Sequence, residues 1–326
     1  MITKNNIKKY LVQKKAIRKN ENIEVEELAG GTINRILKVK IKEKVLIIKQ
    51  FLDKPNIGED IALPPTRYYY EKKAINYLDK SLKEKITPTV LFFDDKNKAI
   101  CMEDLGEENR ADNLMLVNKV KPRIFSKVGK ALAEMHNKSL YNKKIKGEFD
   151  NHAFHEIKIE YRYYKYKEVN DPSLKNVKEK LIEKTRKNNI AFLHHDLKMN
   201  NLFIIKNKFY LIDYEGAHYN DPAMEIGYLL GHLFNYYFLD PSPRNKKIIS
   251  GFWKSYVKNL DFRFKEKLEH NVVKHTGFII IYKLVGIAKQ DFSFVDKKSR
   301  DKLIKIAKRI IRNNRIRKVN QIFKVK

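Results

Sequence analysis

The sequence has few of the features that mark secreted or membrane-spanning proteins. Its 326 residues include one cysteine, Cys101, so no disulfide can form within the chain, and a reducing compartment is expected. No apolar run approaches the ~20 residues that a membrane-spanning helix requires. The first twenty residues predict a basic amphipathic helix without the apolar core of a secretory signal. We therefore expect a cytoplasmic protein with no membrane span.

Acidic residues are also scarce, since 39 Asp and Glu stand against 69 Lys and Arg and leave a formal net charge of +30. Lysine is abundant along the whole chain, which indicates a general bias of composition rather than one binding patch. The exception is residues 297–326, where 13 basic residues accompany a single acidic one. Apolar residues recur there at helical spacing, which predicts a packed helix with a solvated basic face. Binding of a nucleic acid or an anionic surface through this tail is the less favoured alternative.

The hydrophobic pattern changes near residue 104. Before it, extended runs separated by turns predict strands, and one helical pattern covers residues 67–82. After it, most apolar residues follow a helical period, apart from a strand pair at 202–212. We therefore predict an α+β chain of two lobes. Residues 1–103 form a small antiparallel β-sheet lobe with one helix, and residues 104–326 form a larger helical lobe.

The stretch HHDLKMNN, residues 194–201, combines groups that can serve one transfer reaction. Asp196 follows a short apolar run, and Asn201 comes five residues later. Asp213 closes a second apolar run, FYLI, and can meet the first loop in space. Phosphoryl transfer requires a carboxylate that aligns the acceptor hydroxyl and ligands that hold magnesium. Asp196 can face that hydroxyl while the side-chain oxygen of Asn201 binds the metal ion.

Three features nearer the N-terminus can hold nucleotide phosphates. GGTIN, residues 30–34, lies between two predicted strands, and its glycines allow backbone N–H groups to approach a phosphate. Lys49 lies in the apolar run VLIIKQFL, and Glu71 on the following predicted helix can pair with it. Taken alone, each has a simpler interpretation: a glycine hairpin, a solvent-facing lysine and a surface glutamate.

These motifs, in this order, resemble the aminoglycoside phosphotransferase and choline kinase superfamily, which shares the protein-kinase-like fold. The resemblance covers most of the chain, from GGTIN through MEDL to IDYEGAHYNDPAMEIG, with some likeness to methylthioribose kinases. It implies ATP and Mg²⁺ as cofactors. The residues that the resemblance assigns are Asp196 as the catalytic aspartate, Asn201 and Asp213 as metal ligands, Gly30, Gly31, Thr32, Asn34, Lys49 and Glu71 at the phosphates, and Glu103, Asp104 and Leu105 at the adenine.

The chain departs from the family pattern at three positions. His195 stands where the family usually has glycine before the aspartate, and Glu225 replaces a usual aspartate. Lys198 is more typical of protein kinases, where it reaches the γ-phosphate, so we count it among the catalytic residues. NDPAMEIG follows IDYEG within a few residues, which leaves no room for the activation segment of a protein kinase. This short connection favours a small-molecule acceptor.

We therefore predict a small-molecule kinase that moves the γ-phosphoryl group of ATP to a hydroxyl of a sugar-like or amino-alcohol metabolite. Nothing in the sequence names the acceptor or indicates an oligomeric state. Four tyrosines can line the acceptor site or pack a helix against its neighbours: Tyr161, Tyr163, Tyr164 and Tyr166. One alternative is an atypical kinase of protein or RNA-associated targets, suggested by Lys198 and the basic tail. A nucleotide-binding scaffold without activity is the other.

Overall fold

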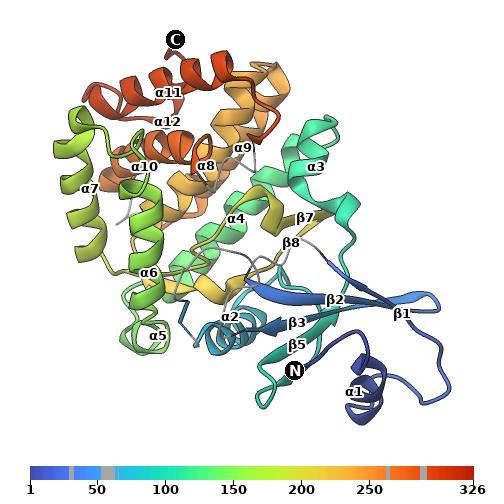
Figure 1. Ribbon diagram of the computed structural model, residues 1–326. Helices are drawn as coiled ribbons and strands as arrows, with labels where there is room; N and C mark the ends of the chain where they lie inside the picture. The colour runs from blue at the N-terminus through green and yellow to red at the C-terminus, as the bar shows by residue number, and fades with distance from the viewer. Residues whose placement is uncertain (29–32, 53–62, 65, 262–264, 287–291) are drawn as a thin grey trace.

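The computed structural model describes residues 1–28, 33–52, 63–64, 66–261, 265–286 and 292–326. A β-rich part and a larger helical part lie at opposite ends of the molecule, with helix α2 beside the sheet (Figure 1). The α+β class predicted from the sequence is confirmed. Of the residues expected at the phosphates, Gly30, Gly31 and Thr32 lie outside the described residues, and nothing below depends on them.

The N-terminal sheet has five antiparallel strands in the order β1-β2-β3-β5-β4. Their bounds are Glu24–Glu27, Asn34–Ile41, Lys44–Phe51, Val90–Asp94 and Ala99–Glu103 for β1 to β5. Alternation along β5 divides its side chains between two hydrophobic cores. Ala99 and Cys101 join the core that contains helix α1, Ile7–Gln13, whereas Ile100 and Met102 join the larger core shared with α2 and the helical part.

Helix α1 is shorter than the sequence predicts. The first twenty residues have an amphipathic pattern throughout, but the helix ends at Gln13. Two residues later Lys15 adopts a positive φ of 56°, which a right-handed helix cannot include. The apolar side chains of the segment still reach the sheet, because Ile17 is buried in the same core as Leu11.

The helical part is built around α4, α8, α9 and α10. Their bounds are Pro122–Ser139, Pro222–Leu239, Pro243–Asn259 and Lys265–Tyr282. Helix α8 is buried without interruption from Pro222 to Tyr236, which is the pattern of a helix surrounded by others. Helices α4 and α9 approach closely at Gly129, where a Cβ atom would lie 2.4 Å from the carbonyl oxygen of Phe252.

Smaller helices cover this centre. They are α3 Ala111–Leu116, α5 Lys143–Glu148, α6 His152–Ile159, α7 Lys175–Lys187, α11 Lys297–Arg312 and α12 Val319–Ile322. Helix α11 buries Leu303, Ile306 and Ile310, which confirms a packed basic helix in the tail. None of the helices that the structure describes is long and apolar enough to cross a membrane.

Two short strand pairs in the helical part carry the loops of interest. Strand β6, Ala191–Leu193, pairs with β9, His218–Asn220, and β7, Leu202–Ile205, pairs with β8, Lys208–Leu211. Asp196 follows β6, Asn201 directly precedes β7, and Asp213 comes two residues after β8. The predicted strand pair at 202–212 is therefore confirmed. Strand β6 and this pair together bring the three polar side chains to one place.

Candidate active site

Asp196 and Asn201 of one loop meet Asp213 of another. The amide nitrogen of Asn201 lies 3.3 Å from Asp196 Oδ2 and 3.5 Å from Asp213 Oδ2, and it also donates to the Asp196 carbonyl at 3.0 Å. The two carboxylate side chains remain 18% and 25% exposed, so a ligand can reach both. The structure thus brings together the three residues that the spacing singled out.

The backbone turns sharply at this place. His195 and Asp213 adopt φ values of 66° and 71°, in the left-handed region that favours glycine. Glu225 on α8 holds the first turn, because its Oε1 accepts the backbone N–H of His195 at 2.7 Å. Its other oxygen lies 2.9 Å from His136 Nε2, and His136 Nδ1 lies 2.8 Å from the Tyr256 hydroxyl. A carboxylate only accepts, so His136 carries its proton on Nε2 in this chain of contacts.

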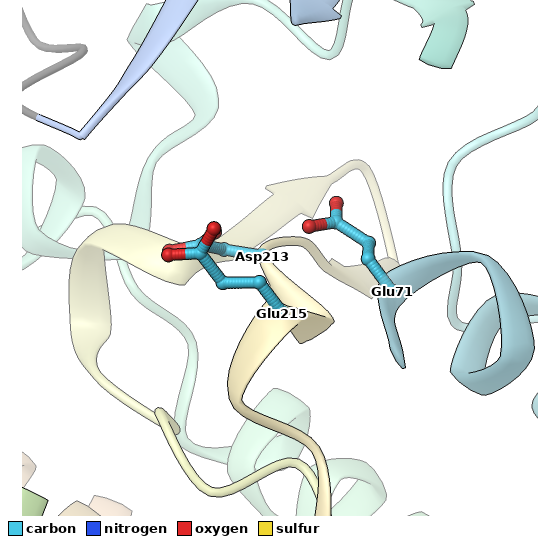
Figure 2. Close-up of side chains that lie close together, drawn as sticks. All are labelled: Glu71, Asp213 and Glu215. Carbon is cyan, nitrogen blue, oxygen red and sulfur yellow. The ribbon is translucent and has the colours of Figure 1, made fainter. Parts of the chain in front are cut away.

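Lys49 joins the sheet to the loop after β8. Its Nζ lies 2.6 Å from Glu71 Oε2 on α2 and 2.6 Å from Asp213 Oδ1. The predicted pair of Lys49 and Glu71 is therefore formed, and the lysine side chain is only 8% exposed. Figure 2 shows Glu71 extending from helix α2, Arg67–Ser81, toward Asp213 and Glu215. The ligand oxygens of these three carboxylates lie within 4.8 Å of one another.

A buried arginine at the start of α2 was not anticipated from the sequence. Arg67 contacts Glu215 Oε2 and Asn34 Oδ1, each at 2.8 Å, and donates to the Leu52 carbonyl at 2.7 Å. Asn34 donates to the same Glu215 oxygen at 2.9 Å. The network assigns Glu215 a partner in the sheet lobe. It also places Asn34, expected at the phosphates, in a buried contact between the two parts of the chain.

The charges of the site are strongly coupled. Burial by itself disfavours the charged form of Lys49, but Asp213 and Glu71 hold the pKa of the ammonium above its usual value. Burial raises the pKa of Glu71 to about 7, against the opposing charge of Lys49. Although burial also opposes ionisation of Asp213, the charge of Lys49 keeps the pKa of this carboxyl below its usual value. Of the two carboxylates beside Lys49, Glu71 is thus the more easily protonated.

Further cations lie against Asp196. Lys198 Nζ is 3.6 Å from Asp196 Oδ2. Lys158 on α6 and Arg162 approach Oδ1 at 3.4 and 3.2 Å, and neither residue was expected here from the sequence. Lys158 lies across Gly216, where a Cβ atom would come within 2.5 Å of its Nζ. Burial opposes the charge of Asp196, yet these cations hold its pKa well below the usual range.

The segment expected at adenine connects β5 to the helical part. Glu103 pairs with Leu46 of β3, and its side chain accepts the Thr89 N–H at 2.6 Å. The Asp104 N–H donates to the Val45 carbonyl at 3.2 Å, and the Asp104 carboxylate pairs with Lys38 at 2.8 Å. Leu105 is buried. These contacts fix the connection between the lobes.

The residues fit a divalent cation. Lys49 occupies one oxygen of Asp213 and leaves Oδ2 beside the Asn201 amide. Mg²⁺ prefers carboxylate and amide oxygens, and turning the Asn201 amide would present its oxygen in place of its nitrogen. Glu71 and Glu215 are less suited because their side chains are only 2% and 6% exposed, against 25% for Asp213. Asp213 and Asn201 are therefore the residues that would hold the ion.

Three buried histidines, His155, His195 and His218, lie next to one another. His155 Nδ1 is 3.1 Å from His195 Nε2, and the His155 ring lies 4.7 Å from that of His218. Burial lowers the pKa of His155 to about 2 and that of His218 to about 4. Of the four tyrosines in the sequence cluster, Tyr163 is buried against Phe278 and its hydroxyl contacts His275, so this one packs the helical core.

The chain is similar to known proteins in both sequence and fold. The model of the phosphotransferase enzyme family (APH) matches residues 24–251. No curated protein sequence matches the chain. Among solved structures, an amicoumacin kinase in complex with AMP-PNP, Ca²⁺ and Ami has a TM-score of 0.57 at 15% identity, over 95% of this chain and 96% of that one.

Two further structures show the same likeness. A choline/ethanolamine kinase family protein from Mesorhizobium loti has a TM-score of 0.55 at 13% identity, over 98% of this chain and 97% of that one. A spectinomycin phosphotransferase in complex with ADP and spectinomycin has a TM-score of 0.53 at 14% identity, over 99% and 98%. At such identities the likeness establishes the fold, which is the two-lobed kinase-like fold predicted from the motifs.

Proposed function

This chain belongs to the phosphotransferase enzyme family, and from that premise we propose that it is a small-molecule kinase that uses ATP and Mg²⁺. The observation that carries the proposal is the meeting of Lys49, Glu71, Asn201 and Asp213 beside Asp196. These are the groups that phosphoryl transfer requires. The AMP-PNP and ADP in two structures of the same fold support a nucleotide as the donor.

Each side chain has a task in this proposal. Residues 1–103 hold the nucleotide, with Lys49 at its phosphates and the segment from Glu103 to Leu105 at its adenine. Asp213 and Asn201 hold the magnesium ion, which neutralises charge on the transferring phosphate when it is bound. The helical lobe, residues 104–326, supplies catalysis and the acceptor site.

Asp196 orients the acceptor hydroxyl and takes its proton as transfer proceeds. A bond forms from the hydroxyl oxygen to the γ-phosphorus, while the bond from that phosphorus to the bridging oxygen of ADP breaks. The bridging oxygen keeps the electron pair, and no covalent phospho-enzyme is needed. Lys198 lies 3.6 Å from Asp196 and is placed to stabilise the charge on the transferring group.

The acceptor is a small molecule in this proposal because of the short segment after Asp213. A single helical turn, Tyr214–Gly216, and strand β9 occupy it, and α8 begins at Pro222. A protein kinase places its long substrate-binding activation segment at this point. The atypical protein or RNA-associated kinase therefore has less structural support.

The test is ADP release from ATP and Mg²⁺ in the presence of pools of hydroxylated metabolites. We expect release that depends on an acceptor and that Asp196→Asn and Asp213→Ala abolish in folded protein. Lys208→Ala, at an exposed lysine of β8, is the control and should keep full activity. Full activity in folded Asp213→Ala would remove the metal assignment, and failure to bind Mg²⁺ with AMP-PNP would overturn the proposed function.

A further inference from the structure

Cationic side chains gather around Asp196 from three parts of the helical lobe. Lys158 and Arg162 approach its Oδ1 and both donate to the His195 carbonyl, at 3.0 and 2.9 Å. Lys198 approaches Oδ2 from the catalytic loop. We call the following four residues the Asp196 cation cluster: Lys158, Arg162, Lys198 and Lys283 of the segment after α10.

The cluster is built into the fold rather than scattered on the surface. The side chain of Arg162 is 3% exposed and that of Lys158 is 11% exposed. The Arg162 guanidinium lies 4.0 Å from the ring centroid of Tyr228, and Lys283 Nζ lies 4.6 Å from the same centroid. Burying like charges this close together is costly unless an opposite charge joins them. The arrangement therefore indicates an anionic ligand.

The helix that supplies two of these cations has an irregular end. Helix α6 runs directly into a π-helical turn, Glu160–Tyr164, which carries Arg162. Such wide turns are rare and occur frequently at functional sites. Lys158 lies four residues before Arg162, so both side chains leave the same face of this segment. The turn thus directs two cations at one carboxylate oxygen.

Charge balance at the site points the same way. Among the described residues, the other carboxylates already have cationic partners: Glu71 and Asp213 have Lys49, and Glu215 has Arg67. Lys198 is assigned to the transferring phosphate. Lys158 and Arg162 then face the single carboxylate of Asp196. Positive charge is in surplus on the acceptor side.

We propose that the acceptor is an anionic alcohol, with a carboxylate or phosphate close to the reacting hydroxyl, and that Lys158 and Arg162 bind this anionic group. The proposal rests on the proposed kinase function and narrows its acceptor class. A cationic amino-alcohol would add positive charge to a place that already has a surplus of it. The proposed acceptor is therefore an anionic alcohol in place of the amino-alcohol expected from the sequence. An arriving anion would also take the donors now on Asp196 Oδ1. That oxygen would then be free to accept the hydroxyl proton.

The experiment is a calorimetric titration of inorganic phosphate into full-length protein saturated with Mg²⁺ and AMP-PNP, so that the nucleotide site is already filled. We expect phosphate to bind and Lys158→Gln and Arg162→Gln each to weaken it about tenfold or more, since a charge-assisted hydrogen bond is lost. Arg162→Lys keeps a charge in place and should retain most of the affinity. Lys165→Gln, at an exposed lysine of the same segment, is the control and should change nothing.

The source of the anionic group is separated by competition against bound phosphate. If glycerate displaces bound phosphate more strongly than glycerol phosphate does, the anionic group of the acceptor is a carboxylate. The reverse order assigns a phosphate ester. Stronger displacement by 3-amino-1,2-propanediol than by either anion would overturn the proposal. So would absent phosphate binding to the loaded wild type, or phosphate binding by folded Lys158→Gln and Arg162→Gln that equals that of the wild type. Failure of the nucleotide to bind contradicts the kinase function instead, because that step precedes the phosphate titration.

Discussion

Glu225 on α8 accepts the backbone N–H of His195 at 2.7 Å, and this contact supports a non-glycine residue with φ at 66°. A left-handed conformation costs an L-residue about 1–2 kcal/mol, which accounts for the glycine that the family usually has here. The chain meets that cost with contacts to all parts of His195. Lys158 and Arg162 donate to its carbonyl, and His155 contacts its ring.

Replacing His195 tests this explanation. Both His195→Gly and His195→Ala remove the ring, so the difference between them isolates the backbone conformation. We expect the alanine variant to have a free energy of unfolding about 1 kcal/mol lower than the glycine variant, measured by urea denaturation. Equal stabilities would mean that the turn relaxes to a right-handed conformation once the ring is gone.

The pair of Lys49 and Glu71 should act as one unit. Lys49→Met and Glu71→Gln should each lower kcat/KM for ATP, and the double variant should lose much less than the sum of the two, because either change already breaks the pair. A cycle on Lys72 and Asp95, an exposed pair on the same lobe at 2.6 Å, is the control. Measured on the free energy of unfolding, the coupling energy of this control pair should stay within roughly 0.2–1 kcal/mol. Additive losses for Lys49 and Glu71 would argue against a shared function.

The candidate site was largely predictable, because its spacing follows from the transfer reaction. Asp196 and Asp213 follow strands, Asn201 precedes one, and Lys49 and Glu71 lie on a strand and the next helix, so each has a local signal. Arg67, Lys158 and Arg162 have none. They reach the site only through tertiary packing, and single basic residues do not stand out among 69 Lys and Arg.

The fold was predictable for a similar reason, and the prediction was wrong only over short segments. Hydrophobic periodicity predicted the strands before residue 104, helix α2, the largely helical remainder and the strand pair at 202–212. It extended the first helix too far, since the amphipathic pattern continues past the left-handed turn at Lys15. Periodicity reports which face is apolar and does not register a single residue whose backbone leaves the helix.

The buried histidines should make the protein less stable in mild acid. Burial depresses the pKa values of His155 and His218, so both stay neutral in the folded protein while the unfolded chain takes up protons below about pH 6.5. These histidines do not change the free energy of unfolding above that pH. As the pH is lowered from about 6.5 to 4, each of them lowers it by roughly 1.4 kcal/mol per pH unit.

Urea denaturation of wild type and His155→Gln across this range measures the effect. In the variant, the free energy of unfolding should depend less steeply on pH, by the contribution of one histidine, because one fewer group binds a proton only in the unfolded chain. His152→Gln, at an exposed histidine of the same helix, is the control and should leave the slope unchanged. A wild-type stability that stays constant from pH 6.5 to 5 would contradict the burial of these rings in solution.

Lys198 is the position where this chain departs from its family toward protein kinases, and its geometry gives a specific kinetic expectation. Its Nζ lies 3.6 Å from Asp196 Oδ2 and its side chain is 27% exposed, so a ligand beside Asp196 can reach it. A compact ammonium there meets the γ-phosphate most strongly as charge develops during transfer.

Removing this charge should therefore lower kcat more than it raises KM for ATP, because the interaction is stronger in the transition state than in the bound substrate. We expect Lys198→Ala to reduce kcat by ~10²-fold, the effect of losing one stabilising donor. Lys198→Arg keeps the charge and should lose less, which separates an electrostatic role from a purely structural one. Steady-state kinetics with the acceptor found by the screen measure both constants. An unchanged kcat in Lys198→Ala would show that the lysine only neutralises Asp196 in the resting enzyme.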